Sequence, residues 1–350
     1  MVTSTEVSGE ILCAGLPDDI TASIEVRDDW VRRLPRATFG FEFVISDLQK
    51  WRPSQTVKVA FLGGSTDLHR DIADATREIT DHCNLSLDFG FANGFYRTWS
   101  ESDKDYVAEI RVSFDQRGYF SLVGADSVDA GAGPPDAKVG GRPYQRSLNL
   151  GNFHVKRPAA WEGVVRHEFL HALGFHHAHQ NLRGPCETAF RWEDDPGYEP
   201  TLSLDGEYVT DSRGRHPGIY TYLAGAPNYW PKQKVDHNLR KLETPEVVVG
   251  PFDRYSIMLY RFDQNYYRDA ASECTPLGDG RSLSDGDKRG LALMYPPTGP
   301  QAASISQLKT AVLGTIQASH RPASPGLETA RAAPSDMELR IAAMLRMTAS

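Results

Sequence analysis

Residues 161–180 read WEGVVRHEFLHALGFHHAHQ and contain the pattern H-E-x-x-H-x-x-G-x-x-H. Its fixed positions are His167, Glu168, His171, Gly174 and His177. Two histidines four residues apart on a helix lie on the same face, so both imidazoles can reach one ion. Glycine can adopt the left-handed backbone that ends a helix, which lets the third histidine approach the ion from a new direction. Because three histidine ligands leave a fourth position open, the stretch predicts a catalytic zinc centre.

The glutamate of this pattern has a separate predicted role. Glu168 follows the first ligand and lies beside the ion, where its carboxylate can act as the general base towards water. His176 and His179 are close enough in sequence to compete as ligands. The spacing favours His177, and we interpret the other two as flanking or surface groups. The alternative is a helix that carries solvated histidines and a surface glutamate.

The complete pattern resembles the zinc signature of the metzincin metallopeptidases. Residues 177–181, HAHQN, are similar to the same region of astacin-like and related bacterial zinc peptidases. Metzincins also have a methionine turn beneath the metal, and residues 253–260, DRYSIMLY, fit that turn. The resemblance implies that Met258 forms the floor of the site and that Tyr260 is a metal ligand that swings away to stabilise the oxyanion. Astacins have a glutamate directly after the third histidine, and this chain departs from them with Ala178.

The resemblance also implies a fold and an activity. The expected fold class is α+β, a metzincin-like zincin fold with a twisted mixed sheet and helices in the upper lobe and a loop-rich lower lobe. Residues 147–152 are expected to form the edge strand, so that Leu148, Asn149 and Leu150 pair with an extended substrate. The expected activity is zinc-dependent endopeptidase cleavage of proteins or peptides, and the expected location is extracellular. The alternatives are a zinc-bound binding module without proteolytic activity and a zinc hydrolase of another family.

Composition and charge exclude other classes of function. The 350 residues carry a net charge of −8 without a basic stripe, so we expect no nucleic-acid partner. No run approaches the roughly 20 apolar residues of a membrane-spanning helix, and the first residues, MVTSTEVSGE, lack the features of a signal peptide. The sequence leaves the oligomeric state open.

Four cysteines permit two disulfides in three pairings, or four reduced thiols. Cys186 and Cys274 are the preferred pair, because a bridge between them would tie a region with little regular structure. Cys13 lies in CAGLPD, which resembles, with one extra residue, the C-G-x-P-D stretch of matrixin pro-segments. That resemblance implies a latency role in which the Cys13 thiolate occupies the open zinc position. A disulfide or an inert thiol are the alternatives for this residue.

Hydrophobic patterns predict α/β structure around the motif. Apolar alternation predicts strands at 57–62, 85–89 and 107–114, and helical spacing predicts a helix over 67–83. Residues 285–295 are expected to form a closing helix, so Met294-Tyr295 is not taken as the methionine turn.

The region 182–250 is rich in Pro, Gly, Tyr and charge, and it should form the lower lip of the cleft. Within it we expect a short helix near 234–242 and two surface histidines, His216 and His237. The loop 124–141 carries three acids that we interpret as solvated, with calcium binding as the weaker alternative. These acids are Asp126, Asp129 and Asp136.

The chain divides by composition into three segments. Residues 1–38 are polar and loop-like, and we interpret them as a leader or pro-like segment. Residues 39–298 form the predicted metzincin-type catalytic domain. Residues 299–350 begin with a Pro/Gly linker and continue as a separate tail with short helices near 305–316 and 336–347. The role of this tail is not readable from the sequence.

Overall fold

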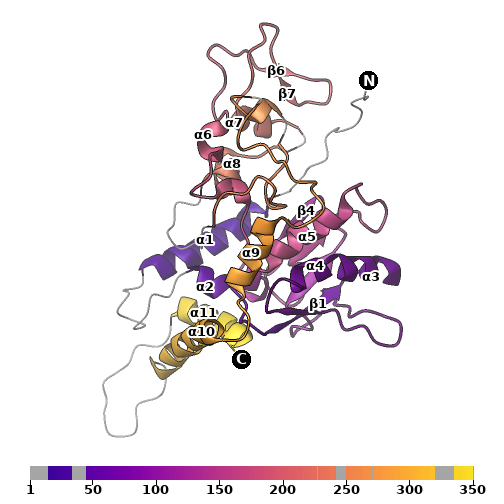
Figure 1. Cartoon of the computed structure of the whole chain (residues 1–350), viewed down its shortest axis with the longest axis vertical. Helices are drawn as coiled ribbons and strands as arrows, with labels where there is room; N and C mark the ends of the chain where they lie inside the picture. Colours follow the sequence, from indigo (N-terminus) through magenta and orange to yellow (C-terminus); the bar gives the residue numbers. More distant parts are fainter. Residues whose placement is uncertain are drawn as a thin grey trace.

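The computed structural model describes residues 15–33, 45–226, 228–241, 250–262, 264–269, 271–319 and 335–349. The fold is α+β: a sheet with its helices makes one lobe, and a region of short elements makes the other (Figure 1). The predicted fold class is confirmed. Within the described ranges, no helix is both long and apolar enough to cross a membrane.

The main sheet has five strands in the order β2-β1-β3-β5-β4. Four of them run parallel, and only β4 runs antiparallel to its neighbour β5. The predicted strands at 57–62, 85–89 and 107–114 correspond to β1, β2 and β3. The strands are β1 (Thr56–Phe61), β2 (Ser86–Asp88), β3 (Ile110–Ser113), β4 (Tyr119–Ser121) and β5 (Leu148–Leu150).

The strand order corrects the prediction of the substrate edge. Leu148, Asn149 and Leu150 form β5, which pairs with β3 on one side and with β4 on the other, and all three residues are buried. They therefore cannot offer a free edge to a substrate. The edge strand at this end of the sheet is β4. The Asn149 amide donates to the carbonyls of Gln116 and Gly118 and so holds the turn that brings β4 alongside.

Helices α3 (Thr66–Ala75), α4 (Arg77–Thr80) and α5 (Trp161–Ala172) pack beside the sheet (Figure 1). The predicted helix over 67–83 is thus two helices, which meet at Thr76. The Thr76 hydroxyl donates to the carbonyl of Ala73 at 2.8 Å and competes there with the helical pattern. Ser65 caps α3 by accepting a hydrogen bond from the Leu68 amide.

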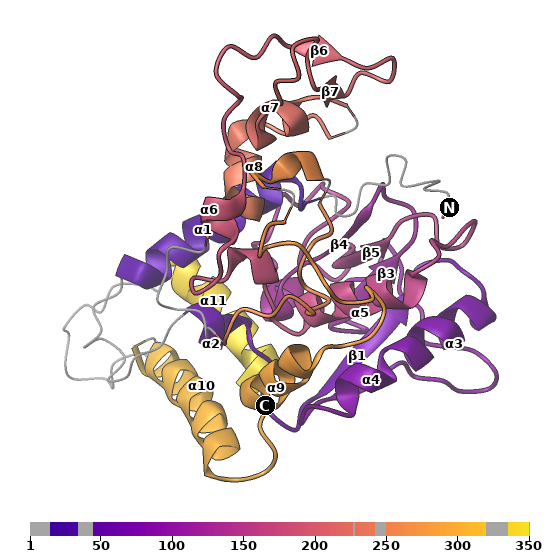
Figure 2. The same ribbon diagram turned by 45° about the horizontal axis from the view of Figure 1, so that its top comes forward.

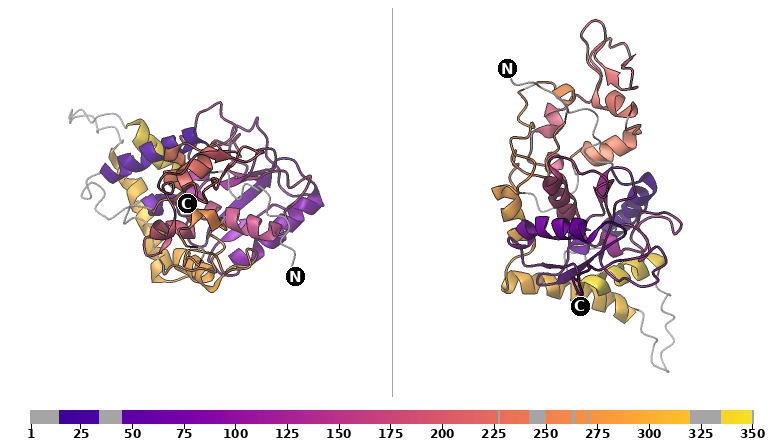
Figure 3. Two further views of the ribbon diagram at one scale, coloured as in Figure 1. Left: turned by 90° about the horizontal axis from the view of Figure 1, so that it is seen from above. Right: turned by 90° about the vertical axis from the view of Figure 1, so that its right-hand side faces the viewer.

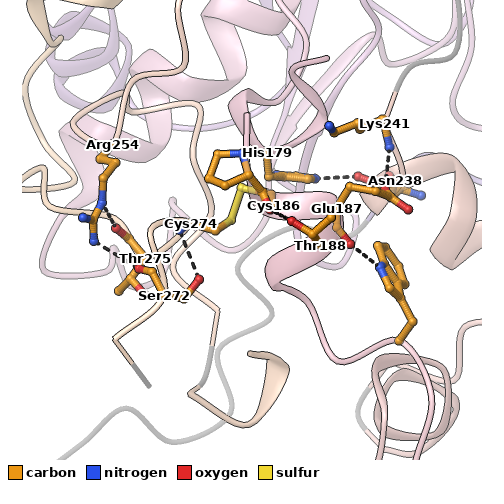
Figure 4. The surroundings of a disulfide bond; sticks show 12 residues. His179, Cys186, Glu187, Thr188, Asn238, Lys241, Arg254, Ser272, Cys274 and Thr275 are labelled. Carbon is orange, nitrogen blue, oxygen red and sulfur yellow. Dashed lines mark hydrogen bonds between the residues drawn. A yellow bond between two sulfur atoms is a disulfide. The ribbon is translucent and has the colours of Figure 1, made fainter. Parts of the chain in front are cut away.

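The lower lobe, residues 178–278, has its own apolar core and is tied by a disulfide. Cys186 and Cys274 are bonded across a sequence separation of 88, which confirms the predicted pair (Figure 4). A hairpin of two short strands makes the tip that lies farthest from the C-terminal helices (Figure 2). The elements of this lobe are η2 (Ala178–Gln180), α6 (Cys186–Ala189), β6 (Thr201–Leu202), β7 (Tyr208–Val209), α7 (Ile219–Ala224), α8 (Lys232–Leu239) and η3 (Gln264–Tyr266).

The closing helix α9 (Asp285–Met294) follows the lower lobe, as predicted. Ser284 accepts from the Asp287 amide, and the Asp287 carboxylate accepts from the Ser284 amide, so the two residues form a capping box. Tyr295 ends the helix and is fully buried. The Met294-Tyr295 pair is therefore the end of a helix, as expected.

The described part of the expected leader is helical, in contrast to the loop-like prediction. Helix α1 (Asp18–Arg33) buries Ile20, Ile24 and Val31, and it is followed by α2 (Ile45–Gln49). Apolar residues at helical spacing were present in this acidic stretch, but its charge obscured them.

The two C-terminal helices pack against the sheet lobe and do not form a separate tail. Helices α10 (Pro300–Ser319) and α11 (Asp336–Ala349) lie at the end of the molecule opposite the β6-β7 hairpin, at the bottom of the right-hand view in Figure 3. Val312, Ile316, Ile341 and Leu345 belong to the same apolar cluster as the sheet. The Pro/Gly linker before these helices suggested a separate tail, although the buried positions on both helices suffice to dock them.

The acids of the loop 124–141 also differ from the prediction. Asp126, in the short helix η1 (Gly124–Val128), and Asp129 are almost fully buried and paired with arginines, whereas Asp136 is exposed. Arg27 of α1 donates to both buried carboxylates, and Arg340 of α11 donates to Asp129. Arginine side chains thus balance the charges of the two buried acids.

Candidate metal centre

The three histidines of the motif lie together in the structure. Helix α5 carries His167 and His171 one turn apart on one face. One ligating nitrogen from each of His167, His171 and His177 lies within 4.8 Å of the others. The Nε2 atoms of His171 and His177 are 2.9 Å apart. Three imidazoles at this spacing form a donor set that suits one zinc ion.

Backbone carbonyls fix which nitrogen of each helical histidine is available. His167 Nδ1 is 2.9 Å from the carbonyl of Ile257, and His171 Nδ1 is 2.7 Å from the carbonyl of Phe175. A carbonyl can only accept, so Nδ1 must carry the proton in both rings. Nε2 then holds the lone pair that a metal needs.

Gly174 reverses the chain after the helix. It has φ +94°, a conformation that residues with a side chain rarely adopt. Its amide donates to the carbonyl of His171, and the Phe175 amide donates to the carbonyl of Leu170. The chain then returns in extended conformation, with His177 directly before η2. The predicted role of the glycine is confirmed.

Burial keeps the three ligands neutral. It lowers the pKa of His167 to about 4 and the pKa of both His171 and His177 well below the ordinary value, with repulsion between the rings as a further cause. Neutral imidazole is the form that binds a metal. The site is therefore ready to accept a cation at neutral pH.

Glu168 lines a cavity that His171 and His177 also line, and its side chain is buried, with the residue 1% exposed. Burial raises the pKa of its carboxyl group to about 8. A cation held by the neighbouring histidines would oppose that effect and favour the carboxylate. A carboxyl group whose pKa lies near neutrality suits proton transfer in both directions.

The turn at residues 253–260 packs against the three histidines. Met258 is 2% exposed, and its carbonyl accepts from the Ala178 amide next to His177. The ring of Tyr260 lies 4.1 Å from that of His177 and 5.6 Å from that of His167, centre to centre. Tyr260 thus lies beside the histidine cluster, and Met258 contacts the backbone of the residue that follows His177.

Asp287 holds this turn in place, a role that the sequence did not reveal. Its carboxylate accepts from the Ser256 hydroxyl at 2.6 Å and from the Ile257 amide at 3.0 Å. The carbonyl of Ile257 in turn orients His167. The sequence placed Asp287 only within the expected closing helix, and nothing in the pattern indicated a contact 31 positions away.

The remaining histidines support the site or lie outside it. His179 is buried, stacks on His177 with ring centres 5.0 Å apart, and its Nε2 lies 2.8 Å from the carbonyl of Asn238. His176 lines the cavity. His237 is exposed and also lines the cavity, while His216 contacts Thr210 far along the lower lobe. Cys13, the predicted latency ligand, lies outside the described residues.

An open cavity of about 1210 Å³ begins at these side chains. This exceeds the roughly 300–1,000 Å³ of most small-molecule pockets and is more typical of a site for an extended chain. Its walls include Glu168, His171, His177 and Tyr260 from the site and residues 119–121 of the edge strand β4. The sequence missed β4, because a strand of three residues has no readable alternation.

No protein-family model matches the sequence, and no curated protein does. Two structures of myroilysin are similar to this chain: one is 24% identical with a TM-score of 0.49, and the other is 23% identical with a TM-score of 0.42. They cover 72% and 76% of this chain and 97% and 98% of their own. High choriolytic enzyme 1, a hatching enzyme zinc-protease from the medaka fish Oryzias latipes, is 16% identical with a TM-score of 0.38, and the match covers 69% of this chain and 90% of that one. The assignment of the site comes from the geometry of its own side chains.

Proposed function

We propose that the protein is a zinc-dependent endopeptidase of metzincin type. The observation that supports this most directly is the convergence of three neutral imidazoles, two of them buried, beside a buried glutamate at a cavity bounded by a sheet edge. A zinc ion held by His167, His171 and His177 would supply Lewis-acid chemistry that polarises a peptide carbonyl and makes water more acidic.

The residues of the chain then have separate roles in catalysis and substrate binding. Glu168 takes the proton from the attacking water and later delivers it to the leaving amine. The Tyr260 hydroxyl stabilises the negative charge that develops on the carbonyl oxygen. Met258 closes the floor of the site as the methionine turn. Residues 119–121 of β4 bind the substrate main chain by strand addition, in place of Leu148, Asn149 and Leu150.

The disulfide supports a location outside the reducing cytosol, since such bonds persist mainly in oxidising compartments. We therefore propose that the protein acts on extracellular protein or peptide substrates. Calcium is not part of the proposal, because the buried acids of the loop 124–141 bind arginines.

Metal analysis combined with digestion of a peptide library tests this function. We expect about one zinc per chain, internal cleavage of peptides, and loss of cleavage in the presence of a chelator, with recovery on addition of zinc. A protein that holds zinc but leaves every peptide intact would instead indicate a binding module without proteolytic activity.

A further inference from the structure

Helix α1 is held in the protein by a fully buried arginine. Arg27 is 0% exposed, and its Nη1 donates to Asp126 at 2.5 Å and to Asp129 at 2.9 Å. Its Nε and Nη2 both donate to Asp28. Removing α1 would leave the Asp126 carboxylate buried without a cation, which is strongly destabilising.

A second set of contacts ties α1 to the last helix. Arg340 of α11 makes two hydrogen bonds to Asp129, each of 2.7 Å, and a third to the carbonyl of Ser23 in α1. Ile20 and Ile24 of α1 form an apolar cluster with Phe120 and Leu122 at the edge of the sheet. Helix α1 therefore shares charges and apolar surface with distant parts of the chain, and its hydrogen bonds to them span sequence separations from 99 to 317.

One face of α1 lines the cavity that contains Glu168 and the histidines. The cavity-lining positions are spaced three and four apart, as expected for one side of a helix: Thr21, Ile24, Glu25, Asp28, Asp29 and Arg32. Arg27 and Ile20 make their buried contacts from a different face of α1. One face of the helix therefore binds the rest of the protein, and the other lines the cavity.

The cavity-lining side of α1 also reaches the lower lobe. Asp18 lies 3.4 Å from Lys234 Nζ, and Glu25 lies 3.2 Å from His237 Nδ1, both on α8. The glutamate is 59% exposed in its side chain, so it remains available to a ligand in the cavity.

We propose that α1 is a permanent wall of the substrate cleft and not a removable leader, and that Glu25 contacts the substrate and favours a basic side chain there. The contact of Glu25 rests on the proposed peptidase function, whereas the permanence of α1 does not. The two parts therefore have separate tests.

The permanence of α1 is tested by cutting the chain behind it. A recognition sequence for a specific protease is placed within residues 34–44, the purified full-length protein is cut, and the products are separated by size exclusion under native conditions. We expect the fragment that contains α1 to co-elute with the rest and the peptidase activity to stay unchanged. A fragment that separates, with a rise in activity, would identify α1 as an inhibitory pro-segment and overturn the proposal.

Two variants sharpen this test. After the cut, Arg27→Met should release the fragment, because the buried Asp126 carboxylate loses its cation and Asp129 keeps only Arg340. Arg33→Met is the matched control: its side chain is 82% exposed and lies 4.0 Å from Asp29. The control fragment should stay bound. Equal retention of both fragments would show that the buried charges do not anchor α1.

The substrate contact is tested by reversing one charge. Glu25→Lys should lower the cleavage of peptides with basic side chains relative to acidic ones by about fivefold or more, given the strength of a partly exposed ion pair. Asp19→Lys makes the same charge change on the same helix away from the cavity, and its peptide preference should equal that of the wild type. Zinc content should be unchanged in both variants. An unaltered preference in Glu25→Lys would remove this residue from the substrate site.

Discussion

Each helical histidine depends on one carbonyl acceptor. The carbonyls of Ile257 and Phe175 accept from the Nδ1 atoms of His167 and His171, so Nε2 of each ring faces the cluster. Burial keeps the rings neutral. The motif predicts the identity of the ligands, but the acceptors belong to segments that only the folded chain brings near.

Glu168→Gln tests the general base. The amide keeps the shape of the side chain but cannot take a proton, so kcat should fall by about 10²- to 10⁴-fold while the zinc content stays the same. Glu162→Gln, on the same helix but outside the cavity, is the control and should keep normal activity. Wild-type turnover in Glu168→Gln would contradict the mechanism.

Tyr260→Phe tests the proposed oxyanion contact. The ring packing against His177 is retained, but the hydroxyl is lost, so kcat should fall by about 10²- to 10³-fold with little change in KM. Tyr255→Phe removes a hydroxyl from an exposed tyrosine of the same turn. Steady-state kinetics on one peptide should separate the two variants, and equal kcat values would exclude the role of Tyr260.

Among the elements, α9 supports the metal centre from a distance. Asp287 caps this helix and also holds Ser256 and Ile257, which precede Met258 in the turn. The same carboxylate thus connects the start of a helix to the carbonyl that orients His167.

Asp287→Ala should therefore weaken zinc binding by about 10- to 100-fold, as loss of a group that orients a metal ligand commonly does. The measurement is a competition titration with a chelator of known affinity. Asp285→Ala removes an exposed acid from the same helical turn and should leave the affinity unchanged. Identical affinities for the two variants would show that the turn holds its shape without Asp287.

The sheet shows why an element can be predicted correctly and still be assigned the wrong function. Residues 148–150 do form a strand, as expected, but β4 pairs on its outer side. Alternation within one segment reports which residues face the core, whereas the order of strands depends on pairing partners elsewhere in the chain.

For the whole molecule, the disulfide closes a loop that spans most of the lower lobe. With a sequence separation of 88, a double Cys186→Ser, Cys274→Ser variant should lose about 4–5 kcal/mol of unfolding free energy in the chain-entropy view. Urea unfolding measures the loss. Addition of a reductant should bring the wild type to the same midpoint as the variant, and equal midpoints without reductant would contradict the prediction.

The docking of the C-terminal helices predicts a dependence of stability on pH. Lys309 of α10 is fully buried, its Nζ donates to the carbonyl of Lys50 and to the Thr348 hydroxyl, and burial lowers its pKa to about 7. In the unfolded chain its pKa returns to about 10.4. Between these values the unfolded state binds one more proton, so stability should rise with pH across this window, by up to about 1.4 kcal/mol per pH unit.

Lys309→Met should abolish this component. Urea unfolding of wild type and variant from pH 6 to pH 10 should give a difference in unfolding free energy that changes with pH. Lys58→Met removes an exposed ammonium group from β1. Its unfolding free energy should change with pH in the same way as that of the wild type. Parallel curves for Lys309→Met would mean that this side chain is not buried in solution.

The same reasoning explains why the helix at residues 18–33 and the docking of the C-terminal helices were not predicted. Residues 18–33 are rich in charge, and residues 300–319 follow a Pro/Gly linker, so their sequences resemble a leader and a tail. Each nevertheless places one basic side chain in the interior: Arg27 meets two buried carboxylates, and Lys309 meets a carbonyl and a hydroxyl. Burial of a charged residue depends on its partner, and the partner lies too far away in sequence to be recognised.

The sequence by itself determined the three histidines, the glutamate between them, the reversing glycine and the favoured cysteine pair, because helical spacing and side-chain chemistry are local properties. Only the tertiary structure decided which strand forms the edge, which carbonyls orient the ligands, and that both ends of the chain pack on the lobe that carries the histidines. Those outcomes depend on contacts between distant segments, whose energies come from shared burial and paired charges that no single segment contains.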